Sequence, residues 1–239
     1  IDSLKSKHGE IIACNFPARY NFLKSKQYDI PDYNLSDCVE LNNFVNNFGK
    51  DKISLIFTSE HTNNPSSAFG HTMIVFHNKN ESFEIADAVH FAADTSQKDS
   101  FISYSYKGFN GKYKGYFLRE PFYKKMYEYN TLEQRYMYTY TLDFTKEQIL
   151  QVISHLFELR KATFKYYFLN GDCATQTTDL LNVISDKERD AQIYYLPIDT
   201  IKEFENNIIS RSKYIPLLNK LNLLINKMSK NEKNLFNKI

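Results

Sequence analysis

The spacing of hydrophobic and polar positions changes part-way along the chain. Before residue 145, short apolar stretches are separated by turn-forming residues, a pattern typical of β-strands. This pattern predicts a buried strand at 53–59, a hairpin over 71–94, strands near 101–106 and 113–118, and an alternating strand within 135–144. We therefore expect a sheet that is largely antiparallel.

Helical periodicity follows the last of these strands. Thr145 and Gln148 have the spacing of a capping box, and apolar residues three and four apart come after them. A second helix is predicted to begin at Cys173, and a single amphipathic helix from Ile215 onward. Strands followed by separate helices indicate the α+β class, with an antiparallel sheet packed against helices.

The length of the chain suits one domain with an extension. Residues 1–50 are expected to form an irregular N-terminal segment with a helix around 35–48, and to belong to the same domain. Residues 51–190 would form the core of that domain. Residues 191–239 would form a C-terminal helical extension.

Composition limits the possible partners and compartments. A formal net charge of +2 provides no basic surface for nucleic acid, and no apolar run is long enough to cross a bilayer. The chain begins at Ile1 without a signal-peptide pattern, so we expect a mature or trimmed product. The three cysteines would all be free in a reducing compartment, whereas one bridge and one free thiol are expected after export.

One cysteine has a position suited to chemistry. In NGDCATQTTDLL (170–181), Asp172 can cap the helix that Cys173 begins. Free backbone N–H groups in a first turn stabilise the reactive thiolate, and the backbone of Cys173 can hold an oxyanion. The charge of Asp172 opposes this, because it raises the pKa of the thiol. Without a base within reach, Cys173 is more simply a small core residue.

The histidines of the predicted hairpin are candidates for that base. With a turn at 79–80, Phe76 pairs with Phe83, and His71 and His90 share the other face as diagonal neighbours roughly 7 Å apart. A slip of one residue would break this arrangement.

Cys173, His71 and His90 together suit nucleophilic catalysis, with His71 as the base and His90 as a supporting ring. The rival hypothesis is a metal site formed by the same three residues. The sequence offers no short ligand spacing such as CxxC or HxxxH, so neither a metal nor a cofactor is expected.

A set of segments, taken in order, resembles the Lnb N-terminal periplasmic domain family, found in bacterial lipoprotein N-acyltransferases. The resemblance runs from Cys14 to about Ile184. Its segments are ACNFPARYNFL (13–23), NNPSSAFGHTMIVF (63–76), HFAAD (90–94), GFNGKYKGYF (108–117), EYNTLEQRYMYTYTL (128–142) and LFELRKATFKYYFLNGDCATQTTDLL (156–181). The family is similar to circularly permuted papain-like enzymes, including lecithin:retinol acyltransferase, and the resemblance implies that fold.

The resemblance also implies roles for individual residues. Cys173 would be the nucleophile and His71 its base, and the next strand would supply an orienting polar group. His90 takes that place here, where the family more often has Asn. The family commonly has Asn before the cysteine, whereas this chain has Asp172.

Export to the periplasm or cell envelope is a further implication of the resemblance. Cys14 and Cys38 would then form a disulfide and leave Cys173 free. An alternative makes Cys14 an acyl-accepting thiol near Arg19.

Three more residues are candidates for binding substrate, and each has a simpler structural role. Ser67 would hydrogen-bond substrate or cap a turn in its loop. Arg19 would bind an anionic headgroup or form a structural ion pair. Tyr167 would line an acyl groove or pack in the core.

Three functional hypotheses remain. The first is a thiol-dependent acyltransferase that acts on lipid or lipoprotein acyl groups through a thioester, with N-acylation of a lipoprotein as its final step. The second is a periplasmic cysteine hydrolase, either a peptidase or an amidase. The third is a catalytically inactive binding module, for which Asp172 is the best argument. A phospholipid or lipoprotein substrate is expected, with a membrane surface as a further partner.

Overall fold

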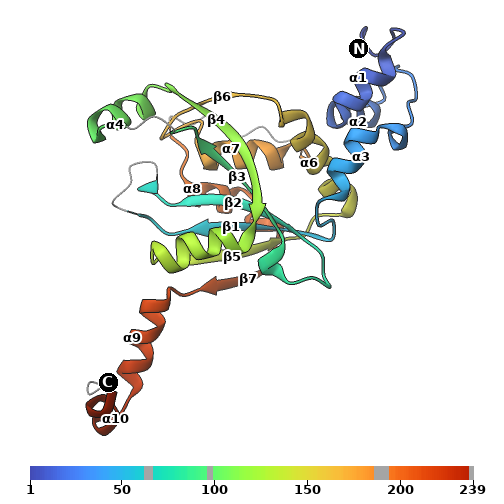
Figure 1. Cartoon of the computed structure of the whole chain (residues 1–239). Helices are drawn as coiled ribbons and strands as arrows, with labels where there is room; N and C mark the ends of the chain where they lie inside the picture. The colour runs from blue at the N-terminus through green and yellow to red at the C-terminus, as the bar shows by residue number, and fades with distance from the viewer. Residues whose placement is uncertain (62–66, 96–98, 186–193, 237–239) are drawn as a thin grey trace.

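The fold is a seven-stranded antiparallel sheet with helices on both faces. The computed structural model describes residues 1–61, 67–95, 99–185 and 194–236 (Figure 1). The strands are β1 (Lys52–Thr58), β2 (His71–His77), β3 (Asp87–Ala93), β4 (Tyr113–Pro121), β5 (Met137–Leu142), β6 (Phe164–Tyr166) and β7 (Ile208–Tyr214). Their order across the sheet is β6-β4-β3-β2-β1-β5-β7, and every pairing is antiparallel. The predicted α+β class is confirmed.

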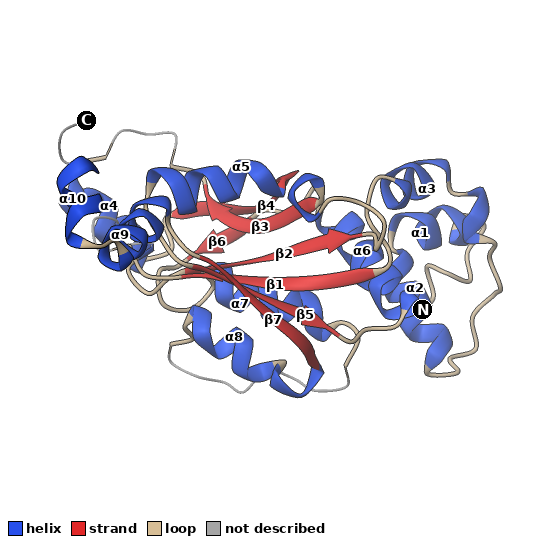
Figure 2. Cartoon of the chain, turned by 90° about the horizontal axis from the view of Figure 1, so that it is seen from below, coloured by secondary structure: helices blue, strands red, loops and turns tan. Residues whose placement is uncertain are grey.

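The helices fall into groups around this sheet (Figure 2). One face carries α6, α7 and α8, and the other carries α5 and the π-helical turn η4. The helices are α1 (Gly9–Asn15), α2 (Pro17–Ser25), α3 (Val39–Asn46), α4 (Phe101–Phe109), α5 (Phe122–Met126), η4 (Tyr127–Leu132), α6 (Lys146–Leu159), α7 (Cys173–Asn182), α8 (Pro197–Glu203), α9 (Leu217–Lys227) and α10 (Lys230–Phe236).

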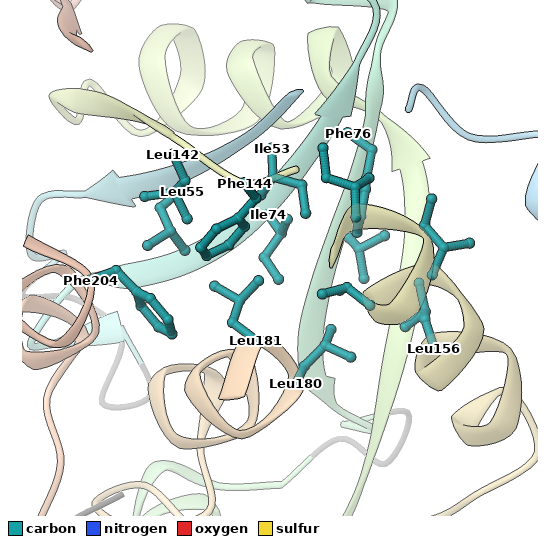
Figure 3. Close-up of a cluster of buried hydrophobic side chains, with 14 of the residues drawn as sticks. Ile53, Leu55, Ile74, Phe76, Leu142, Phe144, Leu156, Leu180, Leu181 and Phe204 are labelled. Carbon is teal, nitrogen blue, oxygen red and sulfur yellow. The ribbon is translucent and has the colours of Figure 1, made fainter. Parts of the chain in front are cut away.

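The main hydrophobic core lies between the sheet and helices α6 and α7 (Figure 3). Alternate residues of the central strands point into it, such as Ile74 and Phe76 of β2. Leu156 of α6 and Leu181 of α7 face them from the helical layer. The predicted capping box of Thr145 is present at the start of α6, so the local signal and the apolar stripe of this helix agree. This packing fixes the first turn of α7 against the central strands.

The predicted hairpin has the right strands but the wrong turn. Phe76 pairs with Asp87 and not with Phe83, so the register is displaced by four residues along β3, from 83 to 87. The connection is longer than two residues and contains a 3-10 turn, Phe83–Ile85. Phe83 leaves the ladder and packs on the ring of His77, with centroids 4.8 Å apart.

Two other segments differ from expectation. The strand expected near 101–106 is helix α4, whose N-cap Ser100 accepts a hydrogen bond from the backbone N–H of Ser103. The N-terminal segment is more helical than predicted, because α1 and α2 precede α3 and pack around their own small apolar cluster.

The C-terminal extension also supplies part of the sheet. Strand β7 pairs with β5, and the amphipathic segment forms two helices, α9 and α10, where one was predicted. The boundary expected at residue 190 lies outside the described residues.

Candidate active site

Helix α7 begins as predicted, with Asp172 as its N-cap. The Asp172 carboxylate accepts hydrogen bonds from the backbone N–H of Thr175 at 3.0 Å and from the Thr175 hydroxyl at 2.9 Å. Gly171 precedes the cap with a φ of 99°, a conformation that favours glycine. Its N–H donates to the Thr175 hydroxyl at 3.0 Å. These bonds place Cys173 at the first position of a well-defined helix start.

The thiol of Cys173 is free and almost completely buried. Burial raises its pKa to about 12, and the charge of Asp172 acts in the same direction. The peptide N–H and hydroxyl of Thr72, with the N–H of Ala174, offset part of this increase. In this structure the sulfur is therefore a thiol, held against strand β2.

The sulfur lies where strands β2 and β3 separate. Their ladder contains three pairs and ends at Ile74 and Val89. Beyond that point β2 continues to His71 alongside β1, and β3 continues to Ala93 alongside β4. The N-terminus of α7 packs against this separated region, because Cys173 faces Thr72. The thiol therefore lies one residue along β2 from His71, whose ring packs on η4 at the other face of the sheet.

His71 and His90 lie on this separated part of the two strands. Their ring centroids are 5.8 Å apart with the rings at 72°. The predicted register of the hairpin was wrong by four residues, but an even displacement keeps His71 and His90 on the same face of the sheet. The predicted proximity of the two imidazoles is therefore present, as diagonal neighbours in a different register.

His71 is neutral in its buried position. Burial lowers its pKa well below the ordinary value, and electrostatic interaction with His90, Arg135 and Lys125 lowers it further. Its ring packs on that of Tyr129 in η4, with centroids 5.8 Å apart. The Nε2 atom has no hydrogen-bond partner among the described residues, so it makes none with the sulfur of Cys173.

His90 is fixed by an acidic residue that sequence reasoning missed. Its Nε2 is 3.0 Å from Oε1 of Glu120 on β4, and Glu120 is 3.2 Å from the buried ammonium of Lys125. Burial disfavours the charge on Glu120, but Lys125 and His90 outweigh it and the pKa of Glu120 is lowered. A charged Glu120 accepts a hydrogen bond from the Nε2–H of His90, which leaves Nδ1 as an acceptor. Burial lowers the pKa of His90 to about 4.

Two buried ring nitrogens of this region have no hydrogen-bond partner within the described part of the chain. They are Nε2 of His71 and Nδ1 of His90. Unpaired buried polar groups cost about 1–3 kcal/mol each and are uncommon in folded proteins. Two of them on neighbouring strands, where β2 and β3 separate, indicate a site that receives a further polar group.

Tyr129 connects the two sides of the site. Burial raises the pKa of its hydroxyl well above the ordinary value, and the charge of Glu128 adds to the increase. Tyr129 also interacts electrostatically with Cys173, and its ring contacts the ring of His71. Arg135 lies over the same ring at 4.8 Å and holds the ends of strands β1 and β5 together through Thr58 and Ser59.

The other predicted site residues make structural contacts of their own. Arg19 lies in α2, where its side chain pairs with Glu158 of α6 at 3.4 Å. Ser67 accepts backbone hydrogen bonds from His61 and Gly70 in the loop before β2. Tyr167 precedes α7 and packs against Gly111.

Cys14 and Cys38 form a disulfide, as the family resemblance implied. The bridge rules out the alternative in which Cys14 is an acyl-accepting thiol, since its sulfur is already bonded. It also leaves Cys173 as the free cysteine.

Metal binding is not supported in the described ranges. They contain no group of three or more His, Cys, Asp or Glu side chains arranged to hold an ion. The hypothesis of a metal bound by His71, His90 and Cys173 is therefore not carried further.

The residues that sequence reasoning missed are Thr72, Glu120, Lys125 and Tyr129. Strand pairing could have indicated Glu120, because β3 and β4 are antiparallel and pair His90 with Leu118. Glu120 is then the diagonal neighbour of His90. The other three residues depend on how α5, η4 and α7 pack, which local patterns do not determine.

The site lies within a segment that matches a known family. The family model of the Lnb N-terminal periplasmic domain matches residues 40–207, which include Cys173, His71 and His90. The chain belongs to this family. Curated proteins and solved structures give no match. Membership in the Lnb N-terminal periplasmic domain family implies an exported chain, which agrees with its disulfide. Across the described ranges, no helix has the length and apolar character needed to cross a bilayer.

Proposed function

We propose that the chain is a thiol-dependent acyltransferase that transfers lipid or lipoprotein acyl groups through a thioester on Cys173. One observation carries the proposal. A free thiol at a helix start lies against Thr72, where β2 and β3 separate, and the same two strands carry two buried histidines with unpaired ring nitrogens. The chain order, with the histidine strand before the cysteine helix, supports a circularly permuted papain-like arrangement. The cell envelope is the proposed location.

The reaction uses His71 as a general base. Its Nε2 takes the proton of the Cys173 thiol while the sulfur attacks the acyl carbonyl carbon. The ester C–O bond then breaks, and the leaving alcohol takes the proton from His71. An amine, such as a lipoprotein N-terminus, next attacks the thioester. The C–S bond breaks, an amide forms, and the amine proton returns through His71 to the sulfur.

Two features of the resting site bear on this mechanism. The thiol must turn from Thr72 toward the imidazole, because Nε2 of His71 makes no hydrogen bond with it at rest. Since both groups are neutral, the proton moves during the attack and no thiolate–imidazolium pair is formed beforehand. Backbone N–H groups at the start of α7 would hold the oxyanion.

The test is formation of an acyl adduct. The chain is incubated with phospholipid vesicles and analysed by intact mass spectrometry, with Cys173→Ala and His71→Asn as variants and Cys14 and Cys38 left bridged. We expect a mass increase of one acyl chain that hydroxylamine removes, is absent from Cys173→Ala and forms much more slowly in His71→Asn. Release of fatty acid or peptide without amide formation would favour a hydrolase. An adduct that also forms on Cys173→Ala would contradict the proposal.

The second candidate function is a binding module without catalysis. The raised pKa of the Cys173 thiol favours it, because the reactive thiolate is scarce at neutral pH. This candidate predicts that small alkylating reagents modify folded Cys173 no faster than they modify a free thiol, and that vesicles bind without leaving an adduct.

A further inference from the structure

Two helices at the end of the molecule opposite α1–α3 expose apolar side chains. Figures 1 and 2 show α4 and α9 at this end of the molecule, with α9 and α10 extending away from the sheet. We name it the apolar end. Its exposed side chains are Phe101, Ile102, Tyr106 and Phe109 of α4, and Leu217, Leu218, Leu221, Leu223 and Leu224 of α9.

Helix α9 has no apolar partner within the described chain. No residue of α9 or α10 is buried, and Leu221 and Leu224 are 42% and 53% exposed. An isolated helix of this length is marginal in water unless its apolar face is covered. The start of the helix is nevertheless fixed, because the N–H of Leu218 donates to Gln134 at 3.0 Å and Asn219 donates to the hydroxyl of Tyr136 at 2.6 Å.

The charge of this segment identifies the partner. Residues 217–236 contain four lysines and one glutamate, a net charge of +3, in a chain whose total is +2. Helix α9 itself has no acidic residue. Lysines beside exposed leucines on a short helix are typical of helices that lie in the interface of an anionic membrane. Exposed aromatic residues, as on α4, are favoured at the same depth.

We propose that the apolar end docks on an anionic phospholipid surface through α9 and α4. Docking would present the candidate site to that surface, because Met137 at the start of β5 pairs with Thr58, and Thr58 pairs with His71. The two hydrogen bonds at the base of α9 are accepted by Gln134 and Tyr136, just before β5. The proposal does not require Cys173 to be catalytic.

Vesicle flotation with the whole chain tests the docking. Vesicles of phosphatidylglycerol and phosphatidylethanolamine are compared with vesicles of phosphatidylcholine alone. The double variant Leu221→Gln/Leu224→Gln should lower the apparent affinity for anionic vesicles at least tenfold. Its matched control is Ile11→Gln/Val39→Gln, which changes two residues of similar exposure on α1 and α3 and should bind as the wild type does.

The lysines have a test of their own. Lys220→Gln/Lys227→Gln should weaken binding by about fivefold for each lysine, and raised salt should remove the difference. Lys7→Gln/Lys161→Gln, at exposed positions outside the apolar end, is the matched control.

Three results would overturn the proposal. They are no vesicle binding by the wild type, equal binding to neutral and anionic vesicles, and a dimer in light scattering that the leucine variant abolishes while vesicles stay unbound. The last result would make a second copy the partner. Cys173→Ala should dock as the wild type does, so a failed acyl-adduct experiment and a failed docking experiment remain distinguishable.

Discussion

Asp172 has two opposite effects on the cysteine that follows it. As the N-cap it holds the first turn of α7 in place, and its carboxylate accepts two hydrogen bonds from Thr175. Its charge, however, raises the pKa of the Cys173 thiol. Burial also raises the pKa of Asp172 itself to about 6. The same carboxylate therefore builds the site and limits the reactivity of the thiol above that pH.

Replacing this charge should make the thiol more reactive. In Asp172→Asn the amide oxygen can still accept both hydrogen bonds from Thr175, while the negative charge is gone. We expect the alkylation rate of Cys173 by iodoacetamide at pH 8 to rise, by about tenfold for each unit that the thiol pKa falls. The measurement is a mass-spectrometric time course from pH 5.5 to 9.

Asp179→Asn is the matched control, since Asp179 is exposed further along the same helix. Its alkylation rate should equal that of the wild type. Equal rates for Asp172→Asn and the wild type at pH 8 would show that the charge of Asp172 does not control the thiol.

The stability of the chain should depend on the proton of Asp172. Its pKa in the folded state, about 6, is above the ordinary value of 3.8, so the folded state binds the proton more tightly than the unfolded state. The stabilisation is fully present below the unfolded value and is lost as pH rises through 6. A shift of this size corresponds to at most about 3 kcal/mol.

Urea unfolding at pH 4, 5, 6 and 7 measures this linkage. The free energy of unfolding of the wild type, relative to that of Asp172→Asn, should fall as pH rises from 4 to 7. Asp179→Asn should follow the wild type throughout. A difference that does not change with pH would mean that Asp172 has an ordinary pKa.

At the scale of elements, local signals located the helices that carry the site. The capping box of α6 and the N-cap of α7 are defined by a few neighbouring residues, and both are confirmed. The aromatic residues near 101–106 favoured a strand in the prediction, whereas this segment is helix α4 with Ser100 as its N-cap. Strand register was harder, because the connection between β2 and β3 contains a 3-10 turn and no two-residue turn.

The proximity of the two histidines was nevertheless predicted, because His90 is a diagonal neighbour of His71 in the predicted register and again when the observed register is extended. The position of the thiol beside Thr72 was not. That contact exists because β2 and β3 separate and α7 packs at the point of separation. Such packing results from residues far apart in sequence, which periodicity along the chain does not report.

The disulfide is the main covalent constraint on the N-terminal helices. Cys14 and Cys38 are 24 residues apart and connect the end of α1 to the start of α3. Closing a loop of this length restricts the unfolded chain by about 3 kcal/mol. The double variant Cys14→Ser/Cys38→Ser should therefore lose about that much in urea unfolding.

Cys173→Ser is the control for the disulfide variant, since it removes a thiol without opening a loop. Hydrogen exchange should show that the loss is greatest in α1 and α2, which pack in their own cluster. An unchanged unfolding midpoint after removal of both bridged cysteines would contradict the prediction.

At the scale of the whole molecule, the sheet and the C-terminal helices contribute differently to stability. Strand β7 covers the edge of β5, and its last residue, Tyr214, packs against the ring of Phe122. Helices α9 and α10 contribute no residue to any of the described hydrophobic clusters. The stable domain therefore extends through β7, and the exposed helices α9 and α10 are available to bind another surface.

Two truncations separate these contributions. Deletion of residues 217–239 removes two hydrogen bonds at the base of α9, each worth about 1 kcal/mol. Within the described residues 217–236 it removes no buried side chain. We expect the free energy of unfolding in urea to fall by at most about 2 kcal/mol. Deletion of residues 208–239 also exposes the edge of β5, whose Met137 and Leu142 are buried, and should cost several kcal/mol or prevent folding. Equal losses in both truncations would mean that α9 supports the sheet directly, and its leucines would then be unavailable to a membrane.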